Sequence, residues 1–506
     1  MKFNYLILCG LIALLFPHDS IAQSFDGYAL YNKQNQNTAY LIDKDGSIAH
    51  SWSCSVPCNY SVKLKENGNI VRGGVYSGNQ LNGAAVGGMV QELDANANVV
   101  WEYVYSNSNH VSHHDFCLLP NGNVILIGWE VMSTAELLQA GASSTNSEKW
   151  PTHFVELQPD GNGSASIVWE WHIKDHFIQD HDASKDNYGV VASNPQLMDI
   201  NAISGGGGGG PGGGGGDWFH ANGIDYNEDL DQLVFSARLA SEIFVIDHST
   251  TTAEAASHSG GNSGMGGDFL YRWGNPSNYG ISGGQTVPAA VHDPRWIKSG
   301  RPNEGYIQLF NNEGGSGGSS VVDAINPPVS GYLFTLSGSS YGPTSYDWRH
   351  ECLANSTGQS ASDRMTNGNT FVNVSNQYMY EVDANDNLVW QYNAGPTKAF
   401  RYECDFVGLE ALLGADPCGL LSIDEETLNS IEFYPNPSSD GLFKIDGVDI
   451  YGSDLKITVL DVYGKTIAEL ENSEVIDLSN MQNGVYYVRL VFNGSDAVTK
   501  KVSYLK

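Results

Sequence analysis

Histidines recur at one position of a repeated strand pattern in this chain. Counting back from the first hairpin turn of each repeat, three segments fall at the start of a strand: His113-His114-Asp115, His220-Ala221-Asn222 and His292-Asp293-Pro294. Near neutral pH an imidazole can act as an acid, a base or a nucleophile. A single histidine in this position more often hydrogen-bonds a neighbouring strand, but three in register favour a shared functional centre. We expect His220 and His292 to be catalytic, His114 to bind substrate and His113 to pack or cap.

Arginines near the same strands could hold an anionic group at that centre. Arg238 lies on the strand after His220, and Arg295 closely follows His292. Two segments from later repeats add further candidates: Trp348-Arg349-His350 and the stretch from Gln359 to Arg364. A guanidinium offers a fork of donors suited to an oxyanion, although each such arginine alone is more often part of a surface ion pair.

Two kinds of hairpin alternate along the chain and would position these side chains. The first turns at Asn-Gly, the strongest short hairpin signal, and it occurs at Asn67-Gly68, Asn121-Gly122 and Asn367-Gly368. The second ends on a tryptophan, and it occurs before Trp52, Trp101, Trp171, Trp273 and Trp390.

One hairpin of each kind gives four short strands, which is one blade of a β-propeller. The copies fall near residues 25–53, 60–103, 113–171, 220–274, 290–335 and 360–393. The sequence therefore predicts an all-β, six-bladed propeller, with five or seven blades as alternatives. The first copy lacks an innermost strand, which the segment from Phe400 to Leu409 could supply and so close the ring. Two stacked β-sandwiches would fit the strand count but not the repeat of roughly 50 residues.

Composition supports this fold and limits the partners. The chain has 506 residues, 41% of them hydrophobic and 16% charged, with 58 glycines, 26 tyrosines and 11 tryptophans, which suits an all-β protein with many tight turns. Its net charge of −32 disfavours nucleic acid and anionic membrane surfaces as partners. An anionic substrate would need a local positive pocket.

The N-terminal residues 1–22 have the form of a secretory signal, with Lys2, an apolar run and a small-residue cleavage site before Gln23. No later stretch has the roughly 20 apolar residues of a membrane span. Six cysteines follow the signal, and an exported protein forms disulfides by default. Cys54 and Cys58 are close enough for a small loop disulfide, which we weigh equally with two free thiols. A zinc site would need a second pair at similar spacing, and we find none.

The composition changes after Cys418, and residues 430–506 read as a separate small β-sandwich joined by a linker over 419–429 to a propeller over 23–418. This segment resembles the C-terminal sorting domain of type IX secretion systems. The resemblance rests on three motifs: Tyr434-Pro435-Asn436-Pro437, Asp461-Val462-Tyr463-Gly464-Lys465 and Asn483-Gly484-Val485-Tyr486-Tyr487. It implies the type IX machinery as a partner, with export through the periplasm and outer membrane to the cell surface or medium.

The propeller region resembles bacterial arylsulfotransferases over about residues 25–412. The matching segments are residues 169–172, 179–180, 187–191, 218–226, 242–256, 260–264, 271–276, 292–293 and 310–312. The resemblance implies a six-bladed propeller that moves a sulfuryl group from a phenolic sulfate ester to a phenol acceptor. The transfer that the resemblance implies needs no nucleotide sulfate donor and no other cofactor. One histidine would carry the group, and other histidines and an arginine would stabilise it.

Carried over by position, His220 and His292 match the central histidines of the family. His350, which precedes the segment ending at Arg364, is our expected nucleophile, and Arg238 and Arg364 are our expected substrate-binding arginines. The chain departs from the family at Asn311-Asn312-Glu313, where an arginine usually follows, and at residues 360–365. The alternative functions are a propeller without catalysis that serves as a secreted or surface binding module, and a calcium-stabilised adhesin with turns at Asp43 and Asp383.

Overall fold

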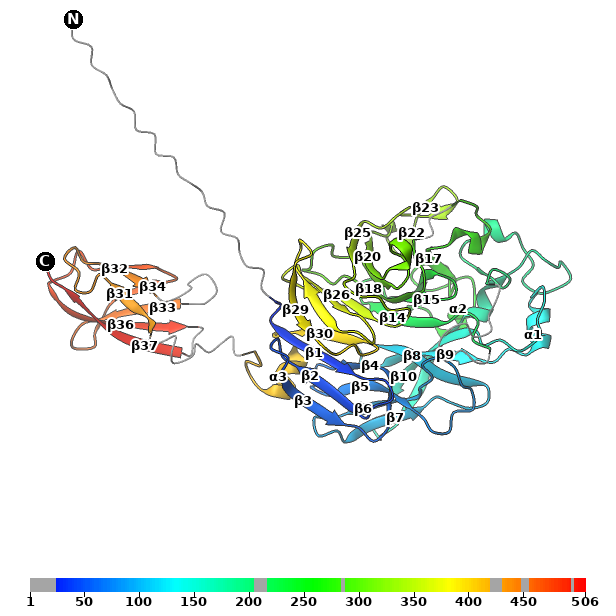
Figure 1. Ribbon diagram of the computed structural model, residues 1–506, viewed down its shortest axis with the longest axis horizontal. Helices are drawn as coiled ribbons and strands as arrows, with labels where there is room; N and C mark the ends of the chain where they lie inside the picture. Colours follow the sequence, from blue (N-terminus) through cyan, green and yellow to red (C-terminus); the bar gives the residue numbers. More distant parts are fainter. Residues whose placement is uncertain (1–23, 204–215, 284–286, 419–429, 447–454, 493–495) are drawn as a thin grey trace, which may run out of the picture. The chain divides into compact units, whose positions relative to one another are not determined.

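The computed structural model describes residues 24–203, 216–283, 287–418, 430–446, 455–492 and 496–506 (Figure 1). Two compact units separate near residue 402, and residues 66–68 group with the C-terminal unit. The expected signal peptide (1–22) and linker (419–429) lie outside the described residues. Among the helices that the structure describes, none is long and apolar enough to cross a membrane.

The N-terminal unit is a β-propeller whose described residues form six four-stranded antiparallel sheets. We number these sheets one to six along the chain. Sheet one contains β1 (Gly27–Asn32), β2 (Thr38–Ile42), β3 (Ile48–Ser53) and β30 (Ala399–Glu403). Sheet two contains β4 (Cys58–Leu64), β5 (Ile70–Val75), β6 (Gly88–Leu93) and β7 (Val99–Val104). Sheet three contains β8 (His110–Leu118), β9 (Val124–Glu130), β10 (Thr152–Pro159) and β11 (Ala165–His172).

The remaining three sheets repeat this order. Sheet four contains β14 (Ala221–Asn227), β15 (Gln232–Ala237), β16 (Glu242–Asp247) and β17 (Phe269–Trp273). Sheet five contains β18 (Val291–Trp296), β19 (Ile307–Asn311), β20 (Val321–Ile325) and β25 (Trp348–Glu351). Sheet six contains β26 (Ala361–Arg364), β27 (Thr370–Asn373), β28 (Met379–Val382) and β29 (Leu388–Tyr392). In the fifth repeat the outermost strand lies beyond residue 335, where we expected that repeat to end.

Sheet one joins the two ends of the propeller sequence. Its order is β3-β2-β1-β30, and Figure 1 shows the late strand β30, in yellow, beside the blue β1. Arg401 of β30 also donates to Glu381 of β28, so the side chains link sheet one to sheet six. The expectation that residues near Phe400 complete the first sheet is confirmed, although residues Val407–Leu413 form helix α3 instead of strand.

The Asn-Gly hairpins form where the sequence predicts them. Each of the three joins an inner strand to its neighbour: β4 to β5, β8 to β9 and β26 to β27. Gly68, Gly122 and Gly368 have φ values of +82°, +88° and +88°, a region open to glycine without steric penalty. Asp43 and Asp383 each accept two backbone N–H groups within their own turns, which accounts for both as hairpin turns.

Tryptophan and phenylalanine side chains fill the space between neighbouring sheets. Between sheets three and four, Phe154 stacks on Trp171, and Phe235 stacks on Phe244. All four are fully buried, and each large apolar side chain removed from water contributes about 1.5–3 kcal/mol. This packing holds the inner strands, and the histidines at their starts, at fixed positions.

Short elements decorate the sheets. Helices α1 (Thr134–Gln139) and α2 (Thr252–Ala255) each begin at a capping box. The 3₁₀ turns cover Ile173–His176, Val191–Ser193, Pro276–Tyr279 and Ser316–Gly318. Two-residue strands pair as β12 (Phe177–Ile178) with β13 (Met198–Asp199), β21 (Val329–Ser330) with β22 (Leu333–Phe334), and β23 (Leu336–Ser337) with β24 (Ser340–Tyr341).

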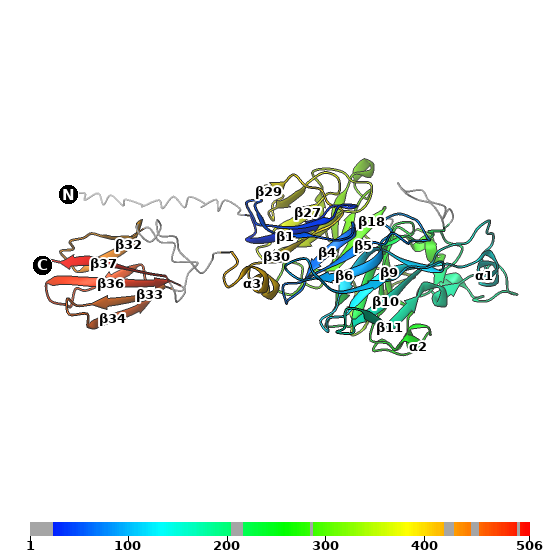
Figure 2. The same ribbon diagram turned by 90° about the horizontal axis from the view of Figure 1, so that it is seen from below.

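The C-terminal unit contains two antiparallel sheets. One contains β31 (Glu432–Tyr434), β32 (Leu442–Asp446) and β35 (Val475–Asp477). The other, seen in Figure 2, contains β34 (Thr466–Glu471), β33 (Leu455–Leu460), β36 (Gly484–Phe492) and β37 (Asp496–Tyr504). They share a core that includes Phe443, Ile457 and Val488.

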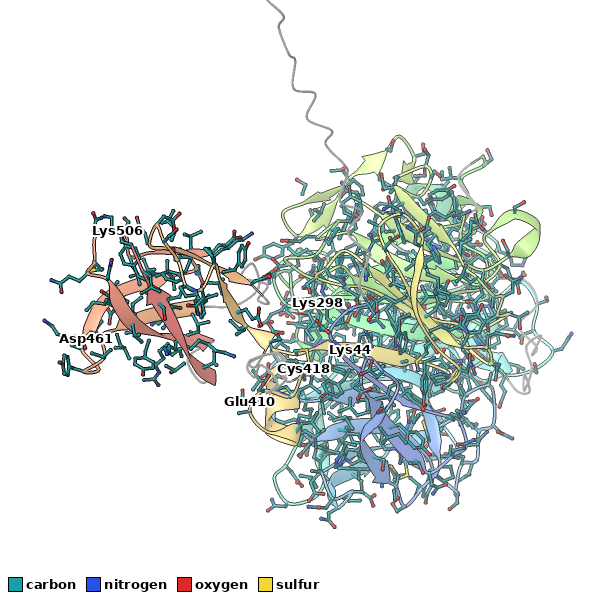
Figure 3. The ribbon with its side chains drawn as sticks, turned by 60° about the vertical axis from the view of Figure 1, so that its left-hand side comes forward. Lys44, Lys298, Glu410, Cys418, Asp461 and Lys506 are labelled. Carbon is teal, nitrogen blue, oxygen red and sulfur yellow. A yellow bond between two sulfur atoms is a disulfide. The ribbon has the colours of Figure 1, made fainter. Side chains whose placement is uncertain are left out.

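The disulfide joins different cysteines from the pair we considered. Cys404 is bonded to Cys418, which Figure 3 labels. Cys54 and Cys58 are buried free thiols, so of the two alternatives for this pair the structure shows the free thiols. Backbone hydrogen bonds to Asn37 and Gln36 hold this loop, and the Cys54 thiol turns to the carbonyl of Trp52.

Candidate active site

A cavity of about 610 Å³ lies where the inner strands of the propeller begin. Its lining includes His114, His220, Arg238 and His292. These come from sheets three, four and five, whose innermost strands β8, β14 and β18 pack side by side. The structure thus brings together four of the six predicted site residues.

Irregular backbone at the start of each inner strand turns the histidines toward the cavity. The pairing shifts register between Ser112 and Phe116 in β8, between Ala221 and Gly223 in β14, and between His292 and Arg295 in β18. His114 and His220 have φ values of 53° and 59°. A β-bulge re-aims a side chain without ending the strand, and such bulges concentrate at the rims of barrels and near active sites.

His292 is held in one tautomer. Its Nδ1 lies 2.7 Å from Oδ1 of Asn312 and 2.8 Å from the carbonyl oxygen of Ala290. Both are acceptors, so Nδ1 carries the proton and Nε2 carries the lone pair. Burial, with the neighbouring His220, lowers the pKa of His292 to about 3, so the ring is neutral at physiological pH. In the described part of the chain no group hydrogen-bonds Nε2. Gly358, which has no side chain, lies beside this nitrogen.

His220 is coupled to a buried carboxylate. Its Nδ1 lies 2.5 Å from Oδ2 of Asp217, whose Oδ1 accepts from Nε1 of Trp129 at 3.2 Å and from the His220 backbone N–H at 3.1 Å. The carboxylate therefore orients the ring and stabilises it when protonated. That arrangement suits an acid and base that exchanges a proton through Nε2.

His114 pairs with its neighbour in sequence. Its Nδ1 lies 2.7 Å from Nδ1 of His113, whose ring stacks on Trp129 with centroids 3.8 Å apart. Burial and the adjacent His220 hold the pKa of His114 well below its usual range. The rings of His114 and His220 meet edge to face at 4.8 Å. His113 thus packs against Trp129 and positions His114.

Arg238 contributes a guanidinium to the cavity. It follows β15 directly, and its backbone N–H donates to the carbonyl of His220. Its Nη2 donates to the carbonyl of Thr357 at 3.2 Å and lies 3.8 Å from Glu313. Because neither contact is a close ion pair, the other N–H groups are available to an anion.

A buried ion network lies beneath the histidines. The two residues that follow His114 and His292, Asp115 and Asp293, both contact Nζ of Lys398, at 2.5 and 2.6 Å. Although burial opposes it, Lys398 lowers the pKa of Asp115 to about 2. This network ties the inner strands of sheets three and five to the segment that leads into β30 and so fixes the two histidines relative to each other.

Two predicted residues lie elsewhere. His350 is on β25, the outermost strand of sheet five, where Nδ1 contacts Asp386 at 2.7 Å and Nε2 contacts the Tyr380 hydroxyl at 2.8 Å. Both nitrogens are engaged away from the cavity, so this placement does not fit the nucleophile we expected there. Arg364 ends β26 with its guanidinium 3.9 Å from the centre of the Trp348 ring, and it does not line the cavity.

Sequence reasoning missed two positioning residues. Asp217 precedes His220 by three residues. An aspartate so close to a candidate catalytic histidine was a signal in the sequence that the two side chains could hydrogen-bond. Asn312 lies in the Asn311-Asn312-Glu313 segment that departs from the family pattern. Its amide accepts from His292 and donates to the carbonyl of Ser356 at 2.8 Å. The role of Asn312 does not follow from spacing, because it depends on how β18 and β19 pair, whereas the contact of Asp217 with His220 is local.

Two groups away from the cavity have side chains of metal-ligand type: Glu130 with His153 and His172, and Asp268 with His176 and His258. In the first, Lys174 already contacts Glu130 at 2.5 Å. In the second, Oδ1 of Asp268 lies 2.8 and 2.7 Å from the Nδ1 atoms of the two histidines. Ordinary ion pairs account for both groups.

The fold and the site together define a β-propeller with a cavity lined by histidines and an arginine. The family model for arylsulfotransferase (ASST) matches residues 18–324, which is more than half of the chain and includes the four predicted site residues that line the cavity. The chain belongs to this family, and the family gives it a sulfotransferase-like function. A second model, for the secretion system C-terminal sorting domain, matches residues 432–504 and indicates export.

Comparison with curated proteins finds no match. Several solved structures resemble the chain weakly. A protein of unknown function from Bacteroides caccae is 10% identical, with a TM-score of 0.40 over 74% of this chain and 98% of that one. The periplasmic gluconolactonase of Pseudomonas aeruginosa is 11% identical, with a TM-score of 0.36 over 92% and 99%. BamB from Moraxella catarrhalis is 8% identical, with a TM-score of 0.29 over 76% and 80%.

Proposed function

We propose that the protein transfers a sulfuryl group from an aryl sulfate ester to a hydroxyl acceptor through a covalent intermediate on His292. The observation that carries this proposal is the environment of His292. Its ring is neutral, Nδ1 is fixed as a donor, and Nε2 is free of protein hydrogen bonds beside a cavity that also holds Arg238 and two further histidines.

In the first step, Nε2 of His292 attacks the sulfur atom and the bond from sulfur to the phenolic oxygen breaks. The departing oxygen takes a proton from Nε2 of His220, whose positive charge Asp217 has stabilised. The transition state is loose and its charge is spread over the sulfuryl oxygens. Arg238 donates to those oxygens, and preorganised donors of this kind contribute about 2.7–4 kcal/mol each.

In the second step, a hydroxyl oxygen attacks the sulfur and the bond from sulfur to Nε2 breaks. The hydroxyl proton goes to His220, which lost its own proton in the first step, so the enzyme returns to its starting state. The first product leaves before the acceptor enters, so the cavity holds the leaving group and the acceptor one after the other. The C-terminal domain directs this activity to the cell surface or the medium.

The test is nitrophenol release from para-nitrophenyl sulfate, with phenol as acceptor. We expect His292→Ala and His220→Ala to lose turnover while they keep the wild-type melting temperature. His350→Gln is the matched control, since His350 lies outside the cavity, and it should retain turnover. Turnover that persists in His292→Ala, or that disappears only in His350→Gln, would contradict the proposal. No turnover by the folded wild-type protein with several aryl sulfates would favour a binding module.

A further inference from the structure

The part of the cavity wall that carries no histidine is built mainly from amide and hydroxyl side chains, beside Lys33 and small residues such as Ala84 and Pro396. The histidines come from sheets three, four and five, whereas sheets one and six supply Gln34, Asn35 and Gln36 before β2, Gln359 before β26, and Ser375 with Asn376 after β27. The cavity therefore has one half with catalytic groups and another whose hydrogen-bonding groups are mostly neutral amides and hydroxyls, with Lys33 as the one cation among the described lining residues of that half.

This polar wall is already organised. Nε2 of Gln359 donates to Oε1 of Gln34 at 3.4 Å, and the Ser375 hydroxyl donates to Oε1 of Gln359 at 2.7 Å. Gln359 has a φ of 62°, a conformation that non-glycine residues seldom adopt and that here places its amide between sheets one and six. For Asn35 and Gln36 no side-chain hydrogen bond occurs within the described residues, so these amides face the cavity free to bind.

The wall offers little to an aromatic ring. Among the described residues that line the cavity there is no Phe, Tyr, Trp, Leu, Ile, Val or Met, and no Asp or Glu. Sites for apolar rings are lined mainly by hydrophobic and aromatic side chains. A phenol ring set against this wall would strip water from amides without replacing its hydrogen bonds, at about 1–3 kcal/mol for each group left unpaired. A molecule with several hydroxyls would satisfy them.

We propose that the natural acceptor is a carbohydrate, whose ring hydroxyls bind the amide wall while one of them attacks the sulfur. This inference rests on the proposed function and names its acceptor. The oxygen–sulfur bond to the sugar forms, the nitrogen–sulfur bond to His292 breaks, and the hydroxyl proton goes to His220. Transfer from an aryl ester to an alcohol is downhill because phenolate is the better leaving group, and no other energy source is needed. A cavity of about 610 Å³ lies in the range of about 300–1,000 Å³ usual for small ligands.

The experiment uses the full-length protein with para-nitrophenyl sulfate as donor and compares phenol with N-acetylglucosamine and cellobiose as acceptors. A burst of nitrophenol without any acceptor reports the first step, so it tests the proposed function separately. We expect kcat/KM for a saccharide to exceed that for phenol at least tenfold. Gln359→Leu and Gln34→Leu should each lower the ratio of saccharide to phenol kcat/KM tenfold or more. Gln391→Leu, on exposed β29, is the matched control and should leave the ratio unchanged.

A burst followed by faster turnover with phenol than with either saccharide would overturn the carbohydrate assignment and leave the sulfotransferase function standing. The same holds if both cavity variants keep the wild-type ratio. The absence of a burst from the folded protein would overturn the proposed function, and the acceptor assignment would fall with it.

Discussion

Replacing Asp217 with asparagine tests the coupling between the carboxylate and His220. Oδ2 of Asp217 lies 2.5 Å from Nδ1 of His220 in a buried site. In Asp217→Asn the amide oxygen can still accept from Trp129 and from the His220 backbone, so the loop should keep its fold. The amide NH₂ would then face Nδ1, so the variant loses the negative charge that stabilises the ring while it carries the proton for the departing phenolic oxygen.

The size of the effect follows from the bond that is lost. A hydrogen bond to a charged group contributes about 1.5–3 kcal/mol, and each 1.36 kcal/mol of activation free energy is about tenfold in rate. We therefore expect kcat to fall about 10- to 150-fold, with KM for the aryl sulfate nearly unchanged because Asp217 does not line the cavity.

The assay is steady-state turnover of a series of aryl sulfates with different leaving groups. A phenol with a higher pKa depends more on protonation as it leaves, so Asp217→Asn should slow phenyl sulfate more than para-nitrophenyl sulfate. Asp186→Asn, an exposed aspartate that contacts Gln139, is the control. The reasoning fails if the folded Asp217→Asn protein slows all leaving groups equally, or if its kcat stays within threefold of wild type.

Three further predictions follow from named contacts. Arg238→Leu should lower kcat about 100- to 1,000-fold through loss of an oxyanion donor, Arg238→Lys should lower it less, and no change in kcat would remove Arg238 from the mechanism. Arg272→Met leaves Glu242 unpaired at a fully buried ion pair of 2.6 Å and should lower the free energy of unfolding by about 3–5 kcal/mol, as denaturant melts can measure. Burial lowers the pKa of His248, but hydrogen bonds to Asp231 and Glu156 outweigh burial and raise the pKa to about 9. The pKa of histidine in the unfolded chain is about 6.5. The wild-type stability advantage over His248→Gln should therefore be full below pH 6.5 and shrink by about 2–3 kcal/mol as pH rises through 9, and a pH-independent difference would contradict this origin.

Much of the fold follows from local sequence rules. Asn67-Gly68, Asn121-Gly122 and Asn367-Gly368 fix three hairpins because glycine accepts a positive φ at no steric penalty. The segment before α3 completes sheet one because an unpaired inner strand in that repeat needs a partner. The outermost strand of sheet five escaped prediction because β21 to β24 intervene before β25, so its position depends on tertiary pairing.

The positions of the cavity histidines could be predicted by counting residues from the hairpin turns. The hydrogen bonds that orient those histidines could not be predicted in this way. His220 and His292 lie at the starts of β14 and β18, and His114 lies at the bulge within β8 instead of at a strand start; counting from turns still brings all three to the cavity. We expected His350 at the centre because it precedes the segment that ends at Arg364. That position in the sequence does not reveal that β25, which carries His350, lies at the outer edge of its sheet. Asn312 and Asp217 escaped because their roles come from hydrogen bonds to particular nitrogen atoms.

Direct detection of the covalent intermediate tests the central claim. The protein is mixed with para-nitrophenyl sulfate without acceptor, quenched, digested and examined by mass spectrometry. The mechanism predicts one sulfuryl group per chain on the peptide that contains His292, lost again when an acceptor is added before the quench and absent from His292→Ala. A sulfuryl group on another residue, or full turnover with no label on any histidine, would contradict the mechanism.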